Sequence, residues 1–385
     1  MAGTINVGQI GHLFMGKAHS HGYRDVAMFF PDVALKPVMK MVVGLEDSVK
    51  DAAAQYGWQE WGHDYKALIA RDDIEVVDIS TGNNTHCEMA VAAAQAGKHI
   101  FCEKPMAMNV AECKQMIAAV EKAGVKHMVD FNYRAVPAVA LAKKMIDDGL
   151  IGKIYHWRAV YLQDWIMDPD FPLVWRLRKD LAGSGPHGDL NAHLVDLARL
   201  LVGEITDVVG LMETFIKKRP LLGEAVGGLE ATRQKEMGDV TVEDAALFLA
   251  RFDNGAVGSF EATRFAGGRR NGNRFEINGS KGSIAFNLER MNELEYYSRE
   301  DPNYAQGFRT IIVGEGVHPY MAAWWPPGHI IGWQHTFVHQ VYNFMNAIGR
   351  NQPATPSFYD GLACQQILEA VEKSVEVGRW VKVGG

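Results

Sequence analysis

The chain has 385 residues, 48% of them hydrophobic and 22% charged, which is ordinary for a soluble globular enzyme and long enough for two domains. Its formal net charge of −7 argues against nucleic acid or an anionic membrane as a partner. No apolar stretch is as long as a membrane span and no signal-peptide pattern opens the chain, so we expect a cytoplasmic protein.

The first part of the chain alternates between short apolar strands and helices. A glycine turn follows the first strand, and glycines close three later helices. Such alternation with short connections predicts a parallel, doubly wound sheet. The expected strands are 4–7, 38–43, 74–80, 100–102 and 125–131, and the expected helices begin near 14 and cover 47–56, 86–96 and 110–123.

The pattern changes near residue 135. A helix at 137–148 leads into a strictly alternating strand at 155–162. The turn sequences Asp253-Asn254-Gly255 and Asn278-Gly279 predict hairpins. We therefore expect a second, α+β domain with a largely antiparallel sheet.

The turn after the first strand has the frame of a dinucleotide fingerprint. Gly11–Gly16 matches G-x-G-x-x-G except that Leu13 occupies the middle glycine, and we expect Leu13 to pack between helix and sheet. Gly44-Leu45 ends the second strand with neither a carboxylate nor a guanidinium. Because no arginine there favours a 2′-phosphate, we expect NAD, with NADP left open.

A lysine follows the strand at 100–102. In Glu103-Lys104-Pro105 the proline ends the strand, because it cannot donate to a sheet ladder. Lys104 therefore lies at the carboxyl end of a strand, where open α/β sheets bind their ligands.

A glycine-rich run at 183–188 enters a helix that we expect to reach about residue 201. Asp189 and His193 are four residues apart and so share one helical face. A carboxylate beside a histidine fixes its tautomer and raises its basicity, as general-base catalysis requires, although such pairs are also common as plain surface contacts. Lys104 could stabilise an alkoxide while His193 takes the proton.

Together these motifs, with the 81–86 loop and Trp175-Arg176, resemble the Gfo/Idh/MocA family of oxidoreductases over essentially the whole chain. Within it, the runs 131–134, 161–165 and 318–320 are most similar to levoglucosan and glycoside 3-dehydrogenase-like members. The resemblance implies an NAD(P)-binding Rossmann domain at 1–134. It also implies a C-terminal α+β substrate and oligomerisation domain at 135–385, with a large, mostly antiparallel open sheet.

The resemblance also implies roles for individual residues. The catalytic set is Lys104, Asp189 and His193. The expected cofactor-binding residues are Gly11, Phe14, Met15, Ser80, Asn83, His86, Glu103, Lys104, Asn132, Trp175 and Arg176. The expected substrate-binding residues are Tyr133, Gln163, Trp165, Asp189, His193 and His335.

The sequence is thus interpreted as an NAD-dependent enzyme that oxidises a secondary hydroxyl of a sugar, anhydrosugar or glycoside. His193 takes the proton as hydride passes to nicotinamide. Two alternatives stay open: a glycoside-cleaving enzyme that oxidises its sugar transiently with tightly bound NAD, and a non-catalytic dinucleotide sensor. We expect a homo-oligomer, dimer or tetramer, and no metal, since the cysteines and histidines follow no metal-site spacing.

Overall fold

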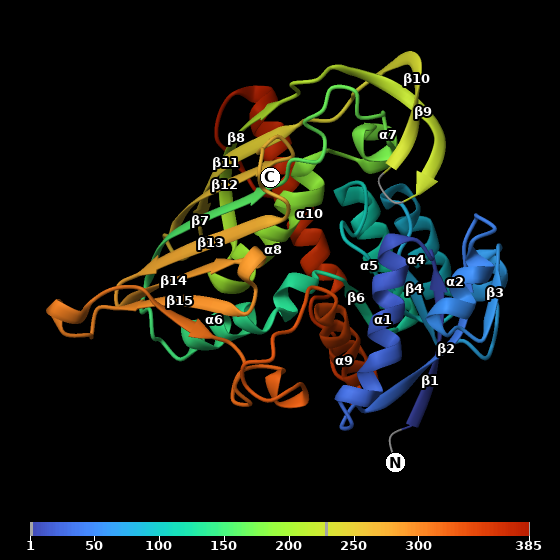
Figure 1. Cartoon of the computed structure of the whole chain (residues 1–385), viewed down its shortest axis with the longest axis horizontal. Coiled ribbons are helices and arrows are strands. Elements are labelled where there is room, and N and C mark those ends of the chain that lie inside the picture. The colour runs from blue at the N-terminus through green and yellow to red at the C-terminus, as the bar shows by residue number, and fades with distance from the viewer. Residues whose placement is uncertain (1–2, 228–229, 385) are drawn as a thin grey trace. The chain divides into compact units, whose positions relative to one another are not determined.

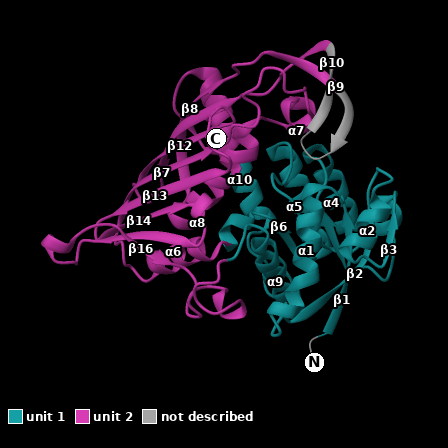
Figure 2. Cartoon of the chain, viewed as in Figure 1, with its two compact units in different colours: residues 1–135, 331–365 teal, residues 136–330, 366–385 magenta. Residues whose placement is uncertain are grey.

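The computed structural model describes residues 3–227 and 230–384, except for the side chains of 223–235. The chain forms two compact units, shown in Figure 2. Unit 1 combines the chain up to residue 135 with 331–365, and unit 2 combines 136–330 with 366–385. The boundary expected at 134/135 lies one residue away, and the return of 331–365 to unit 1 was not expected.

Unit 1 is built on a six-stranded, wholly parallel sheet with the order β3-β2-β1-β4-β5-β6 (Figure 1). The predicted doubly wound fold is confirmed. β4 and β5 are mostly apolar and almost fully buried, as expected of strands covered on both faces, although β4 also carries the buried Asp78. The strands are β1 (Gly3–Ile10), β2 (Leu35–Val43), β3 (Glu60–Gly62), β4 (Val76–Ile79), β5 (His99–Cys102) and β6 (His127–Val129).

The helices of unit 1 cover both faces of this sheet. The strand order reverses between β1 and β4, so right-handed crossovers place the helices after these two strands on opposite faces. That reversal is also where doubly wound folds bind ligands. The helices are α1 (Phe14–Phe29), α2 (Val49–Tyr56), α3 (Tyr65–Ile69), α4 (His86–Gln95), α5 (Val110–Ala123), α9 (His335–Gly349) and the start of α10 (Phe358–Val377).

Local signals set the ends of α5 where the sequence predicted them. The Asn109 side chain accepts a hydrogen bond from the Glu112 amide, and the Glu112 carboxylate accepts one from the Met108 amide. The first bond satisfies a donor of the first turn, and the second ties Glu112 to the residue before the N-cap. At the other end Gly124 adopts a left-handed conformation that closes the helix.

Helix α9 returns late in the chain to pack on α1. The approach is close at Gly22, where a Cβ atom would lie 3.0 Å from the Phe337 carbonyl oxygen. The sequence at 331–365 does not predict this packing, because α9 contacts a helix that lies near the other end of the chain.

Unit 2 contains a nine-stranded sheet in which only the pairing of β12 with β7 is parallel. The predicted, mostly antiparallel sheet is confirmed, as are its hairpins β11–β12 and β13–β14. The strands are β7 (Ile154–Leu162), β8 (Ile205–Glu213), β11 (Ala245–Phe252), β12 (Val257–Thr263), β13 (Gly272–Gly279), β14 (Gly282–Asn287), β15 (Glu293–Ser298), β16 (Arg309–Ile312) and β17 (Val381–Lys382). A separate pair joins β9 (Lys218–Gly227) to β10 (Glu230–Asp239).

One face of the large sheet carries helices and the other carries exposed side chains. The helices of unit 2 are α6 (Pro137–Asp147), α7 (Lys179–Ala182), α8 (Ala192–Leu201) and the end of α10. On β8, the Gly210 amide donates to Ser374 of α10 at 2.9 Å, while the next residue, Leu211, is exposed. Leu247 and Leu249 of β11 are also exposed. The sheet therefore keeps an uncovered apolar face within unit 2.

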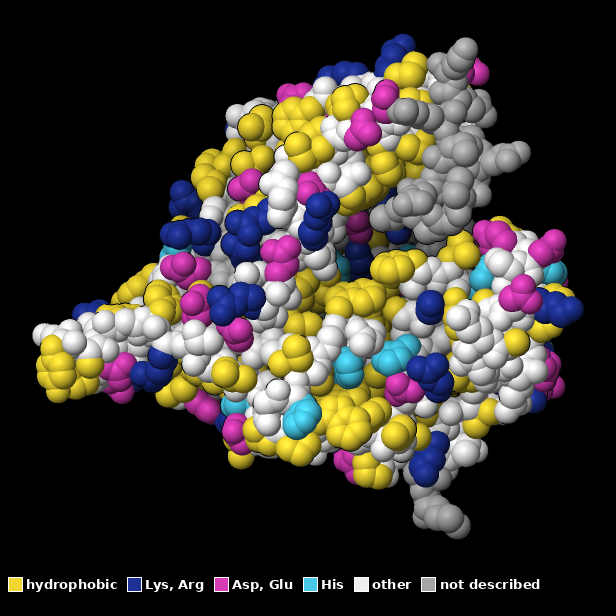
Figure 3. Space-filling view, in the orientation of Figure 1, with side chains coloured by type: hydrophobic (Ala, Val, Ile, Leu, Met, Phe, Trp, Pro, Cys, Tyr) yellow, Lys and Arg dark blue, Asp and Glu magenta, His cyan; other side chains and the backbone are white. Residues whose placement is uncertain are grey.

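Charged side chains of both signs are interspersed over the face drawn in Figure 3. Within residues 3–227 and 230–384, no helix is both long and apolar enough to cross a bilayer.

Candidate active site

The turn between β1 and α1 requires glycine at two positions. Gly11 has φ of +103°, and a Cβ atom there would lie 2.7 Å from the Ser80 carbonyl oxygen. A Cβ atom on Gly16 would lie 2.3 Å from the Gly11 carbonyl oxygen. The turn thus brings β1, β4 and the first turn of α1 into direct backbone contact, as the fingerprint requires.

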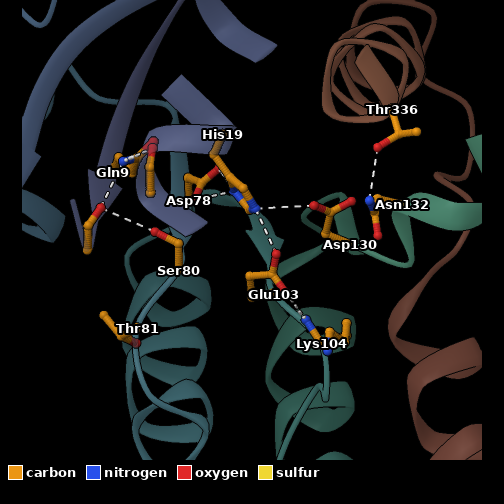
Figure 4. A network of polar contacts seen from close by, with 12 residues as sticks. Gln9, His19, Asp78, Ser80, Thr81, Glu103, Lys104, Asp130, Asn132 and Thr336 are labelled. Carbon is orange, nitrogen blue, oxygen red and sulfur yellow. Dashed lines mark hydrogen bonds and ion pairs between the residues drawn. The ribbon is translucent and has the colours of Figure 1, made fainter. Parts of the chain in front are cut away.

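Two polar side chains hold this turn, and both appear in Figure 4. The buried Gln9 amide donates to the carbonyl oxygens of Gly11 at 2.8 Å and Gly16 at 2.9 Å. The Ser80 hydroxyl lies 3.1 Å from the Ile10 carbonyl oxygen and 3.2 Å from that of Gly11. Ser80, which was predicted to bind the cofactor, therefore stabilises the turn. Gln9 was not predicted to have a role in the site.

The start of α1 is open to an anion. No side chain caps it and its first turn holds no acidic residue, so backbone N–H groups point outward with the positive end of the helix dipole. Leu13 is 58% exposed, so the expectation that it packs between helix and sheet is wrong. Phe14 is exposed and stacks on Trp333, and Met15 is partly exposed. This surface fits the pyrophosphate of a dinucleotide.

The end of β2 is occupied by a histidine. A Cβ atom on Gly44 would lie 2.2 Å from Nδ1 of His12, and Nε2 of that ring lies 2.8 Å from the Ser48 hydroxyl. The exposed Glu46 carboxylate lies 3.8 Å from His12 Nδ1. An acidic side chain therefore lies near this strand end, where dinucleotide folds hold the ribose of NAD.

The loop after β4 is tied to the loop after β5 by His86. Its ring is fully buried, with Nδ1 3.0 Å from the Pro105 carbonyl oxygen and Nε2 3.2 Å from that of Thr81. Burial lowers the pKa of His86. Asn83 lies in the turn of helix (Asn83–Thr85) that precedes α4 and is partly exposed. His86 thus positions the loop on which Asn83 lies.

Glu103 fixes the backbone at Lys104. The Lys104 amide donates to Glu103 Oε2 at 2.8 Å, and the other carboxylate oxygen, Oε1, accepts from His19 Nε2 at 3.0 Å. Figure 4 shows the two residues at the carboxyl end of β5. Glu103 is buried, whereas Lys104 is partly exposed. Both were predicted to lie near the cofactor, but the link to His19 was not foreseen.

A buried ionic cluster lies behind this lysine. The His19 ring donates to Asp78 at 2.9 Å and also contacts Asp130 at 3.1 Å, and the Tyr23 hydroxyl donates to Asp78 at 2.8 Å. Burial alone would lower the pKa of His19, but the charge of Asp78 and hydrogen bonds to Asp130, Asp78 and Glu103 raise it well above its usual value. His19, Glu103 and Asp130 offer donor atoms within 4.8 Å of one another, and the protonated His19 ring supplies positive charge among these carboxylates.

The raised pKa makes a testable contribution to stability. The contribution of His19 to the free energy of unfolding is fully present below the unfolded-state pKa of about 6.5. It is lost as the pH rises through the pKa of His19 in the folded protein. The difference in unfolding free energy between the parent and His19→Gln should therefore shrink from about pH 7 to 9, by at most about 1.4 kcal/mol per pH unit. Burial raises the pKa of the neighbouring Asp130 to about 6, so that carboxylate is charged in this range.

Urea unfolding at each pH measures this difference. His63→Gln removes an exposed histidine from the same unit and serves as the control. A gap between parent and His19→Gln that stays constant over the range would contradict a charged His19.

Three further predicted residues lie in unit 1. Asn132 is buried and its amide donates to the Thr336 hydroxyl of α9 at 2.9 Å (Figure 4). Tyr133 is buried beside it. His335, the first residue of α9, is half-buried, its Nδ1 accepts from the Gly332 amide at 3.0 Å, and burial lowers its pKa.

In unit 2, Asp189 lies on a π-helical turn and His193 lies on the first turn of the α-helix that follows. His187–Asn191 forms a π-helical turn that continues into α8, whose second residue is His193. Wide turns of this kind occur often at functional sites. His193 is 4% exposed, with its ring 6.0 Å from that of Tyr161. Asp189 accepts a hydrogen bond from Arg264 at 2.6 Å, a partner that was not predicted.

The predicted substrate residues of unit 2 form a hydrogen-bonded chain. The Trp165 indole donates to Gln163 at 2.8 Å, and Gln163 donates to Asn271 at 3.2 Å. The Tyr161 hydroxyl also donates to Asn271, at 2.7 Å. Separately, the Arg176 guanidinium lies 4.4 Å from the centre of the Trp175 ring, on a short helix (Trp175–Leu177).

The predicted residues are therefore grouped within each unit. Unit 1 carries Gly11, Phe14, Met15, Ser80, Asn83, His86, Glu103, Lys104, Asn132, Tyr133 and His335, and unit 2 carries Gln163, Trp165, Trp175, Arg176, Asp189 and His193.

Comparison with known proteins identifies the family. Residues 5–131 match the oxidoreductase family with an NAD-binding Rossmann fold, and residues 139–285 match the Gfo/Idh/MocA C-terminal domain. The levoglucosan dehydrogenase of Pseudarthrobacter phenanthrenivorans is 45% identical over 384 residues, covering 99% of this chain and 98% of that protein. The chain belongs to the Gfo/Idh/MocA family. It is an enzyme with an NAD-binding domain, as its motifs predicted.

Solved structures of this family agree with the fold. Levoglucosan dehydrogenase in complex with NADH and levoglucosan superposes with a TM-score of 0.93 at 44% identity, covering 99% of each chain. An oxidoreductase domain protein from Kribbella flavida superposes with a TM-score of 0.94 at 49% identity, covering 100% of each chain.

Proposed function

We propose that this Gfo/Idh/MocA protein is a sugar dehydrogenase that oxidises a secondary hydroxyl group of a neutral sugar, anhydrosugar or glycoside. The observation that carries the proposal is the buried His193 beside a π-helical turn that holds Asp189, in a chain 45% identical to a levoglucosan dehydrogenase. A dinucleotide sensor has no need of a buried histidine one turn away from a carboxylate, which favours an enzyme.

Each catalytic residue has one role in this proposal. His193 accepts the proton of the substrate hydroxyl, and Asp189 orients the imidazole. Lys104, held at its backbone by Glu103, stabilises the negative charge that develops on the oxygen. Bound NAD supplies the acceptor for the hydride that leaves the same carbon atom.

The surroundings of His193 fit a carbohydrate. Trp165 offers an aromatic face on which sugar C–H groups can stack, while Gln163 and Asn271 supply amide groups for hydroxyls. The named substrate of the relative, levoglucosan, is an anhydrosugar with three secondary hydroxyl groups, so it is the first compound to test.

The test is the appearance of reduced nicotinamide absorbance when the purified protein meets levoglucosan, glucose, glycosides and inositols with NAD or NADP. We expect NAD reduction with at least one neutral sugar and a lower rate with NADP, because the loop after β2 carries Glu46 and no arginine. Release of an aglycone from a glycoside without net NADH would instead support the glycoside-cleaving alternative.

The uncovered face of the large sheet also supports the predicted homo-oligomer. Leu211, Leu247 and Leu249 lie on adjacent strands and are exposed together. Such a patch is larger than isolated apolar side chains of a monomer surface, so we propose that two copies of unit 2 cover it in a dimer or tetramer. Sedimentation equilibrium of the protein measures this state.

A further inference from the structure

A buried arginine lies next to the proposed catalytic carboxylate. Arg264 directly follows β12, is 1% exposed and donates from Nη2 to Asp189 Oδ2 at 2.6 Å. We propose that Arg264 has two tasks in the sugar dehydrogenase proposed above: it holds Asp189 in place, and its remaining N–H groups bind an oxygen atom of a neutral sugar.

Half of this guanidinium is committed to the protein and half is not. Nη2 meets Asp189, whereas Nε and Nη1 are buried and donate to no acceptor among the described residues. A buried N–H donor of a charged group costs free energy when it has no acceptor. Such donors are therefore expected where a ligand or a water molecule accepts their hydrogen bonds. Asp189 is partly exposed, with 31% of its side chain accessible, so the pair lies at the edge of the buried region.

The neighbours of Arg264 are those of the proposed sugar site. Its guanidinium carbon lies 5.1 Å from the centre of the Trp165 ring, so the guanidinium packs against this aromatic side chain. Trp165 in turn begins the hydrogen-bonded chain through Gln163 and Asn271 to Tyr161, whose ring lies beside His193. Arg264 and His193 therefore belong to one continuous set of side chains within unit 2.

The charges around Arg264 favour an uncharged ligand. Asp189 pairs with it directly, and Asp244 faces both Arg264 and a second buried arginine, Arg219. Arg219 itself donates to backbone carbonyl groups, at 2.7 Å for that of Asp168. The charges of Asp189, Asp244 and Asp168 thus act on these two buried arginines, so the cluster carries no excess positive charge. Arg264 is suited to donating hydrogen bonds to a sugar oxygen rather than to attracting a sugar acid.

The first test compares Arg264→Gln and Arg264→Lys with the parent in the presence of levoglucosan and NAD. We expect Arg264→Gln to raise KM about 10- to 100-fold, the usual cost of losing a hydrogen bond from a charged group, and to lower kcat because Asp189 is no longer held. Lysine keeps the charge but lacks the planar fork, so it should restore only part of kcat/KM. Arg158→Gln, an exposed arginine on β7, is the matched control and should behave as the parent.

A second measurement separates this role from a purely structural one. Arg264→Ala should regain part of its turnover when guanidinium chloride is added at low millimolar concentration, whereas equal sodium chloride should have no effect. Binding of NADH should be unchanged in all three Arg264 variants, because Arg264 is not among the predicted cofactor-binding residues. If Arg264→Gln does not fold, the rescue of Arg264→Ala and the KM of Arg264→Lys still decide the question.

The outcomes distinguish the inference from the function on which it rests. A parent protein that oxidises no neutral sugar would overturn the proposed function. A parent that oxidises levoglucosan, with Arg264→Gln and Arg264→Lys unchanged in KM and kcat, would overturn the role of Arg264 alone. A parent that binds glucuronate more tightly than glucose would overturn the preference for neutral ligands.

Discussion

Replacing His193 by alanine should lower turnover about 10²- to 10⁴-fold at neutral pH, the usual contribution of a positioned general base. His193 is 4% exposed on the first turn of α8, directly after the turn that carries Asp189. Without an imidazole, the substrate proton must pass to water or hydroxide, so the residual rate should increase as the pH is raised. Steady-state rates of NADH formation over a range of pH measure both effects.

Binding of NAD is the control for this variant, because the glycine turn between β1 and α1 belongs to unit 1 and His193 belongs to unit 2. Calorimetric titration should give the same affinity for the parent and for His193→Ala. A variant whose turnover stays within a few-fold of the parent would remove His193 from the mechanism.

Replacing Lys104 by alanine should lower turnover by about 10²- to 10³-fold, as expected for one lost donor to a developing oxyanion. Glu103 receives the Lys104 amide at 2.8 Å and is itself held by His19, so the lysine starts from a fixed backbone. Lys104→Arg should not restore the rate, because a planar fork cannot take the place of a compact ammonium group at this position.

Initial rates with saturating sugar and NAD measure the effect of the two Lys104 variants. Lys114→Ala removes an exposed lysine from α5 of the same unit and should leave the rate unchanged. An arginine variant with a nearly normal rate would mean that Lys104 supplies only positive charge.

The elements whose ends are set by local chemistry could be predicted from the sequence. Helix α5 spans the predicted 110–123 because Asn109 and Gly124 cap it. Strict alternation predicted the antiparallel sheet of unit 2, since one face of β11 is buried and the other is not. The return of 331–365 to unit 1 could not be predicted, because it depends on how α9 packs against Gly22 of α1.

The candidate site was predictable where a motif carries its own geometry. Gly11 and Lys104 lie where the turn and the strand end required. The π-helical turn at Asp189 was not predicted, because it depends on tertiary contact: a Cβ atom on Gly185 would lie 2.1 Å from the Glu243 carbonyl oxygen. Arg264 was missed although a signal existed, since the alternation of β12 continues inward from Phe260 and Ala262 to that residue.

The most direct test of the account follows a deuterium atom. Levoglucosan deuterated at its ring carbons is mixed with the parent protein and NAD, and the reduced cofactor is analysed by mass spectrometry. We predict that the NADH formed carries one deuterium, since hydride leaves the carbon whose hydroxyl His193 deprotonates. Reduced cofactor without deuterium, or a changed sugar with no reduced cofactor at all, would contradict direct oxidation of a sugar hydroxyl by this enzyme.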